Sequence, residues 1–269
     1  MKIKIVLSVI FATIIFVALM FLVDFFTFSD FLTNSVSTPV IFIIYGLLSL
    51  LAAAIVIVPF CFFLKDNVKI LGLKSNKWHH NLLKGALLGI CCIIAGLIVI
   101  YFFGNIEIQN IPVRWTFIIT SFFMTALCAT SEELFFRGFV QSQFMKSSKP
   151  FWVILLTSLM FVLLHIFNQD ITLLSVINIF LASILLGFSF YHTKSLYFPI
   201  GLHIFWNSAQ SFLGFSVSGE AEPSFWKLTL KNENIINGGN FGFEGSIICT
   251  LILLGLLAIS LYSSLKAKK

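Results

Sequence analysis

Charge is the scarcest feature of this sequence. Charged residues make up 10% of its 269 residues and hydrophobic residues make up 59%, whereas about a quarter of an ordinary soluble domain is charged. A soluble protein of this size needs far more polar surface than this composition supplies. The composition therefore excludes an ordinary soluble fold and predicts an integral membrane protein.

Cysteine motifs are absent as well. None of the five cysteines has the CxxC spacing of a metal or redox motif, and all five lie in apolar segments. Their odd number and the lack of a pairing pattern argue against a disulfide framework. We interpret them as packed thiols.

A basic face is also missing, although the net charge is +6. The lysines lie in short connections between apolar runs, which argues against nucleic acid as a partner. With the N-terminus in the cytoplasm, thirteen of the seventeen Lys and Arg residues fall on the inner side, which is the bias of cytoplasmic connections. The sequence predicts a multi-pass protein of the cell membrane with both termini cytoplasmic.

Long apolar runs dominate what is present. A bilayer core of ~30 Å requires about 20 helical residues. The first run is too long for a cleavable signal and lacks a small-residue cleavage site. The predicted fold class is all-α, a polytopic transmembrane bundle of about eight helices. The predicted spans are approximately 5–27, 39–64, 82–104, 113–144, 151–168, 171–192, 196–215 and 246–265.

The sequence contains no internal repeat, soluble domain or flexible linker, so we expect residues 1–269 to form a single integral membrane domain. The longest connection, 216–245, contains several glycines and aromatic residues. This composition favours a compact outer cap over a mobile loop.

Ionisable residues within the predicted spans are the candidates for function, because charge is costly to bury in a bilayer. Glu133 and Arg137 are four residues apart on one helical face and can pair, whereas Glu132 is rotated by about 100°. Glu132 is therefore predicted to be the freer carboxylate. The full set is Glu132, Glu133 and Arg137 in the fourth span, His165 in the fifth and His203 in the seventh, with the amides of Asn178 and Asn207.

Depth in the bundle relates three of these residues. At 1.5 Å per residue, Glu132 lies ~20 Å, His165 ~21 Å and His203 ~12 Å from the cytoplasmic ends of their helices. We expect one site in the cytoplasmic half to the middle of the bundle, with Asn207 one turn beyond His203. A structural interpretation stays open for each residue, as an ion pair or as a contact between helices.

A carboxylate, two histidines and an amide suit peptide hydrolysis by activated water. Glu132 can act as general base with a histidine sharing the proton work. A second histidine and an asparagine can donate to the oxyanion that forms when water adds to an amide carbonyl. The chemical alternative is a metal, because Glu132, His165 and His203 could form a zinc site with an open position, although no HExxH motif is present. No other cofactor is predicted.

These residues resemble the motifs of the CPBP family, which includes the CAAX prenyl proteases and the bacteriocin-processing or immunity proteins of the ABI group. The family pattern is EExxxR, FxxxH and HxxxN, in that order. This chain has Glu132 to Arg137, Phe161 to His165 and His203 to Asn207. Together the motifs are specific, and the similarity covers roughly 113–215, a CPBP-like catalytic core.

The resemblance implies an intramembrane endopeptidase of eight helices. By motif position, Glu132 with His165 would activate water, and His203 with Asn207 would form the oxyanion hole. Glu133 and Arg137 would support the site. The family has been described both as metal-dependent and as glutamate-dependent, so both mechanisms stay open.

The resemblance leaves the substrate broad: a peptide or a membrane protein within a lipid bilayer. Lysine-poor outer loops and the lack of organelle signals favour a bacterial plasma membrane, and some relatives act in bacteriocin processing or self-immunity. One alternative is a non-catalytic immunity or scaffold protein of the same fold, which the intact motifs disfavour. Another is an ion-coupled transporter, which the lack of a visible inverted repeat disfavours.

Overall fold

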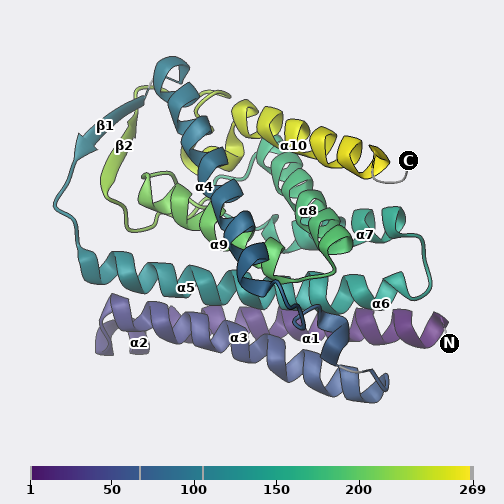
Figure 1. Ribbon diagram of the computed structural model, residues 1–269. Coiled ribbons are helices and arrows are strands. Elements are labelled where there is room, and N and C mark those ends of the chain that lie inside the picture. Colours follow the sequence, from purple (N-terminus) through teal and green to yellow (C-terminus); the bar gives the residue numbers. More distant parts are fainter. Residues whose placement is uncertain (1, 67, 105, 267–269) are drawn as a thin grey trace.

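The computed structural model describes residues 2–66, 68–104 and 106–266. Within these ranges the chain is an all-α bundle with eight long helices (Figure 1), which confirms the predicted fold class. These helices are α1 (Lys2–Thr27), α3 (Thr38–Phe63), α4 (Trp78–Phe103), α5 (Trp115–Glu133), α7 (Pro150–His165), α8 (Leu173–Thr193), α9 (Tyr197–Phe212) and α10 (Ile247–Lys266). The short helix α2 (Asp30–Ser35) follows α1.

Five helical stretches are long and apolar enough to cross a membrane. α7 and α9 have 16 residues each, so their length is about 24 Å, less than the ~30 Å of a bilayer core. Both are shorter than predicted, because α7 ends at His165 and α9 ends before Gly214, whose φ of 92° does not continue a helix. The two short helices carry the candidate histidines.

The outside of the bundle is apolar and the inside contains buried polar groups. Phe62 and Phe167 are 85% and 79% exposed, whereas Glu133 and Arg137 are 0% and 1% exposed. This is the inverse of a soluble protein surface and suits a lipid environment. The distribution agrees with a multi-pass membrane protein.

The helices form two groups. α1, α3 and α5 lie side by side as one layer, α9 packs against α5, and α4, α8 and α10 form the second group around α9 (Figure 1). α4 packs along α9, and α10 packs on α8. α1 begins and α10 ends on the same side of the bundle, while the two strands lie at the opposite end (Figure 1).

Glycines allow α4 and α9 to approach closely. A Cβ atom at Gly201 of α9 would lie 2.2 Å from the carbonyl oxygen of Leu82, and one at Gly85 of α4 would lie 2.2 Å from that of Phe198. Small residues at such contacts let helix backbones pack tightly in a membrane. α9, which carries His203 and Asn207, is thereby fixed against α4.

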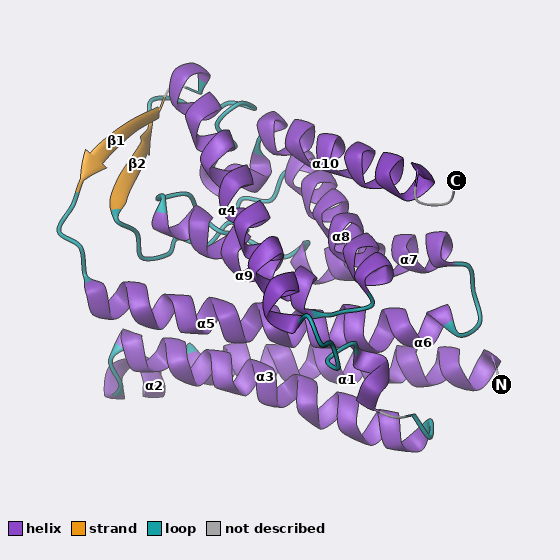
Figure 2. Ribbon diagram, viewed as in Figure 1, coloured by secondary structure: helices purple, strands orange, loops and turns teal. Residues whose placement is uncertain are grey.

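A two-stranded antiparallel sheet adds to the predicted helices (Figure 2). β1 (Ile106–Asn110) pairs with β2 (Trp226–Leu230), with Ile106 opposite Leu230 and Asn110 opposite Trp226. The sequence analysis did not predict this sheet, because each strand has five residues and its partner is far away in the chain. The pairing joins the α4–α5 connection to the 216–245 segment.

The 216–245 segment is folded along its length. Besides β2 it contains two 3₁₀ turns, η3 (Gly239–Phe241) and η4 (Phe243–Gly245). The buried side chain of Asn237 donates to the carbonyl oxygen of Gly104 at 2.7 Å. The segment is thus attached to the end of α4.

Candidate active site

The two adjacent glutamates lie at a change of helix type. Glu132 and Glu133 are the last residues of α5, which continues directly as a π-helix, Leu134–Gln141, and then as α6 (Ser142–Met145). π-helical turns are rare and often occur at functional sites. The apolar pattern of the sequence did not reveal this segment.

Glu133 and Arg137 form the predicted ion pair. Arg137 Nη1 donates to Glu133 Oε1 at 2.8 Å, and both side chains are buried. Arg137 Nη2 also donates to Ser183 Oγ of α8 at 2.8 Å, and its guanidinium lies 4.5 Å from the ring centre of Phe161. Arg137 therefore connects α7 and α8 to the glutamates.

Glu133 has a second partner that the sequence did not indicate. His203 Nδ1 of α9 lies 2.9 Å from Glu133 Oε1, the same oxygen that Arg137 contacts. A carboxylate oxygen accepts, so this ring nitrogen carries a hydrogen. Helical spacing suggested Arg137 as the partner of Glu133. The structure shows that Glu133 also orients the imidazole of His203.

Glu132 is the freer carboxylate, as predicted. Its Oε2 lies 3.9 Å from His203 Nε2 and has no hydrogen-bond partner among the described residues. Its side chain is 24% exposed, whereas that of Glu133 is fully buried. The carboxylate of Glu132 therefore remains available to a ligand.

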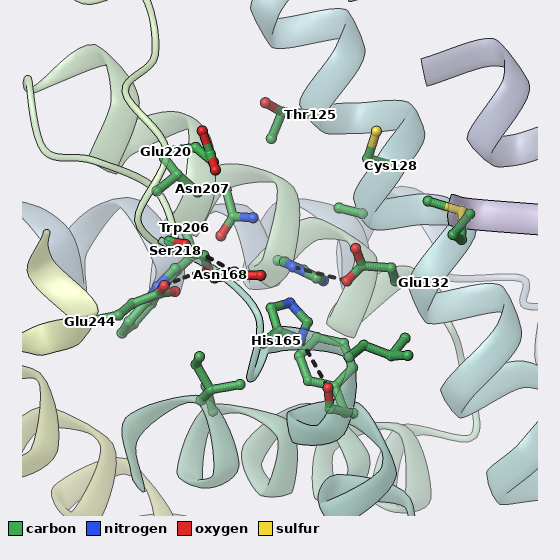
Figure 3. A pocket seen from close by; sticks show the side chains of 18 of the residues that line it. Thr125, Cys128, Glu132, His165, Asn168, Trp206, Asn207, Ser218, Glu220 and Glu244 are labelled. Carbon is green, nitrogen blue, oxygen red and sulfur yellow. Dashed lines mark hydrogen bonds and ion pairs between the residues drawn. The ribbon is translucent and has the colours of Figure 1, made fainter. Parts of the chain in front are cut away.

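His165 is the last residue of α7. Its Nδ1 lies 2.9 Å from the backbone carbonyl oxygen of Phe161, and its ring stacks on that of Phe161 with the centres 4.6 Å apart. A carbonyl oxygen only accepts, so Nδ1 donates, and in the neutral ring Nε2 keeps its lone pair. Figure 3 shows His165, Glu132 and Asn207 pointing into one space from α7, α5 and α9.

A cavity of about 710 Å³ collects the four predicted catalytic residues, Glu132, His165, His203 and Asn207. Its lining also includes residues of α1, α3 and the 216–245 segment. No residue of α5 beyond Glu132, and none of α6, contributes to this lining. The cavity therefore extends from the C-terminal end of α5 toward the end of the bundle that carries the strands.

The cavity reaches the connections at Phe28, Asn168 and Val217, which the sequence assigns to the outer side. The predicted depth of the catalytic side chains, in the cytoplasmic half to the middle of the bundle, stays a prediction. Since α7 ends at His165, this residue lies at a helix terminus rather than within a longer span.

The cavity is acidic. Five carboxylates line it, and no Lys or Arg is among its described lining residues. The pKa of Glu222 is raised to about 7: burial is the largest cause, the hydrogen bond from Ser121 Oγ at 2.7 Å lowers the pKa, and the nearby Glu220 raises it. The sequence analysis counted only Glu132 among these groups as a site residue. The five carboxylates belong to Asp24, Glu132, Glu220, Glu222 and Glu244.

The comparison with protein families gives a match in this region. Residues 112–209 match a family model described as type II CAAX prenyl endopeptidase Rce1-like. This match supports the CPBP family assignment. The matched segment contains the EExxxR, FxxxH and HxxxN motifs, while α1, α3, α4 and α10 lie outside it. No curated protein matches the chain.

The matched family supports a CAAX-protease-like endopeptidase in a membrane, acting on peptide substrates. Such an enzyme needs a water-activating base and donors for an oxyanion. The CPBP motif residues supply both kinds of group around the cavity.

The zinc alternative does not fit this CPBP site. Among the residues that the structure describes, no three His, Cys, Asp or Glu side chains are arranged to hold a metal ion. The mechanism proposed below therefore uses only side chains of the protein.

Asn178, which the sequence analysis named as a buried amide, lies behind the CPBP site. Its Nδ2 donates to the carbonyl oxygens of Glu244 and Ser246 at 2.7 and 2.9 Å, and its Oδ1 accepts from Thr250 Oγ1 at 2.7 Å. Asn178 thereby fixes the end of the 216–245 segment. Its role is structural.

Proposed function

We propose that this protein is an intramembrane endopeptidase that hydrolyses peptide bonds without a covalent intermediate. The observation that carries the proposal is the convergence of Glu132, His165, His203 and Asn207 on one cavity from three helices. A scatter of structural polar residues would be expected to pair with neighbouring helices instead. The carboxylate of Glu132, which lines the cavity and is 24% exposed, supports its role as the reacting group, whereas Glu133 is fully buried outside the lining.

In the proposed reaction, Glu132 accepts a proton from water, which attacks the carbonyl carbon of the substrate. His165 Nε2 has a free lone pair and accepts the second hydrogen of that water, which orients it. The C–O bond forms as the carbonyl becomes an oxyanion. Glu132 then returns its proton to the amide nitrogen, and the C–N bond breaks.

The oxyanion is stabilised by His203 and Asn207. The amide of Asn207 donates directly, and His203 Nε2 donates when its ring carries both protons. Glu133 supports this arrangement because its contact with His203 Nδ1 leaves Nε2 directed toward Glu132, 3.9 Å away. Arg137 holds Glu133 in place.

We also propose a division of the single domain. Residues 113–215 form the catalytic core, and residues 216–245 form a cap over the outer end of the cavity. The lining residues from Val217 to Glu222 support the second assignment. The rest of the bundle holds the core in the bilayer.

The substrate proposed is a peptide or a segment of a membrane protein, reached from the outer side of a bacterial cell membrane. Thirteen basic residues on the predicted inner side support cytoplasmic termini. The acidic lining without Lys or Arg favours substrates with positive charge near the scissile bond. Bacteriocin processing or self-immunity would suit such a substrate.

The decisive experiment measures cleavage of a peptide library by the purified protein in liposomes. We expect Glu132→Gln to lower the turnover by about 100-fold or more, since a general base typically contributes at least that factor. Glu107→Gln is the matched control, because Glu107 is half-exposed on β1 and, among the residues that the structure describes, forms an ion pair only with Lys231, at 3.1 Å. Unchanged cleavage by the Glu132→Gln protein would overturn the mechanism.

A further inference from the structure

Glu244 is a buried carboxylate that the proposed reaction does not use. It lies in η4, lines the cavity and is 7% exposed. None of the described Lys, Arg or His residues forms an ion pair with it. Its oxygens accept instead from three neutral donors: Trp206 Nε1 at 3.2 Å, Gln210 Nε2 at 3.3 Å and Ser218 Oγ at 2.8 Å.

Two of these donors belong to the catalytic face of α9. Trp206 directly precedes Asn207 and follows His203 by three residues, so all three lie close together around the helix. Gln210 is one turn further along and its side chain is fully buried. Because one oxygen, Oε1, accepts from both Trp206 and Gln210, Glu244 fixes the rotation of α9 about its axis.

The third donor leads to the catalytic end of α7. The carbonyl oxygen of Ser218 accepts from Asn168 Nδ2 at 2.9 Å. The backbone N–H of Asn168 in turn donates to the carbonyl oxygen of His165 at 3.1 Å. A continuous series of hydrogen bonds thus runs from Glu244 through Ser218 and Asn168 to His165. Figure 3 shows these four residues.

Ser218 is held in a strained backbone conformation. Its φ is 50°, a left-handed value that is uncommon for a residue other than glycine. Such a conformation persists only where its surroundings enforce it. Here Ser218 and Gly219 are the central residues of a turn that two backbone hydrogen bonds between Val217 and Glu220 close. In this turn the hydroxyl of Ser218 is held by Glu244 and its carbonyl oxygen by Asn168.

We propose that Glu244 is a positioning residue that joins the His165 end of α7 to the His203 and Asn207 face of α9 through the 216–245 segment. This inference rests on the proposed function, since it assigns the water-orienting and oxyanion groups to those two helices. A carboxylate suits the role because both of its oxygens accept. Glutamine keeps the size but offers a single accepting oxygen to three donors.

The test compares Glu244→Gln with Glu233→Gln, which makes the same substitution in the same segment. Glu233 is exposed, does not line the cavity and accepts from Asn240 at 2.8 Å. We expect Glu244→Gln to lower kcat about 10- to 100-fold with KM changed less than about twofold, because positioning acts on the transition state. Glu233→Gln should keep both constants.

Hydrogen exchange provides a readout that does not depend on hydrolysis. In Glu244→Gln, amides of 166–172 and 214–222 should exchange faster, with the rest of the bundle unchanged. Ser218→Ala removes only the donor to Oε2 and should show the same effect more weakly. If the two changes act through one series of contacts, the amides of these two segments should exchange no faster in the double variant than in Glu244→Gln alone.

The outcomes separate the two proposals. If the wild type hydrolyses peptides and Glu132→Gln does not, wild-type kinetics for Glu244→Gln would overturn the positioning role alone. If the wild type hydrolyses nothing, the proposed function fails and exchange decides whether Glu244 joins the two helices. Unchanged exchange in both segments would then overturn that connection as well.

Discussion

Glu133 carries two buried contacts on one oxygen, with Arg137 Nη1 at 2.8 Å and His203 Nδ1 at 2.9 Å. Glu133→Gln removes the negative charge and leaves Arg137 buried without a counter-ion. Removing one partner of a buried ion pair costs about 3–5 kcal/mol. We expect the free energy of unfolding in mixed micelles to fall by about 3 kcal/mol, together with loss of hydrolysis.

The control for Glu133 is again Glu107→Gln. Glu107 and Lys231 are 53% and 59% exposed, and exposed pairs contribute at most about 1 kcal/mol. Equal losses in the free energy of unfolding would show that the buried contacts of Glu133 stabilise the fold no more than the exposed pair of Glu107 does.

The sequence predicted only some of these single-residue contacts. The pairing of Glu133 with Arg137 followed from their spacing of four residues in a helix, and so did the free orientation of Glu132. The contact from His203 to Glu133 did not follow, because it depends on how α9 packs against α5. Glu244 was missed for the same reason, since its partners become neighbours only when the 216–245 segment folds onto α9.

At the scale of elements, the close packing of α4 and α9 yields a prediction. The Cβ of Gly201→Ala would lie 2.2 Å from the carbonyl oxygen of Leu82, so the helix backbones must separate. Overpacking of this kind costs about 1–3 kcal/mol. Because His203 is two residues away, we expect lower turnover as well as a lower free energy of unfolding, both measured in detergent.

Gly255→Ala is the matched control. A Cβ at this position of α10 would meet no atom within 4 Å, and alanine is favoured over glycine in a helix by about 1 kcal/mol. The control should therefore be as stable as the wild type or more so. A Gly201→Ala protein that behaves like this control would contradict the close approach of α4 and α9.

The helices were predictable because apolar runs of spanning length are a strong local signal. Other elements were not. The π-helix after Glu133 has no periodic signature that separates it from an α-helix, and the pairing of β1 with β2 joins segments that are distant in the chain. The premature end of α7 at His165 was also hidden, because the apolar pattern continues through Ile166 and Phe167.

For the whole molecule, the arrangement of charge indicates the side of the membrane to which the cavity opens. Acidic groups line the cavity between the middle of the bundle and the end that carries the strands, and most lysines lie in the connections at the other end. Cytoplasmic connections carry the excess of Lys and Arg in membrane proteins. The cavity would then open away from the cytoplasm, toward peptides outside the cell.

Labelling in intact cells checks this direction. Asn232 lies beyond β2 and Asn76 lies between α3 and α4, and both are exposed asparagines. With a membrane-impermeant maleimide, we expect Asn232→Cys to react in intact cells and Asn76→Cys to react only after permeabilisation. The wild type, with its five native cysteines, gives the background. The reverse pattern would place the cavity mouth in the cytoplasm, and the substrates would then be cytoplasmic rather than external peptides.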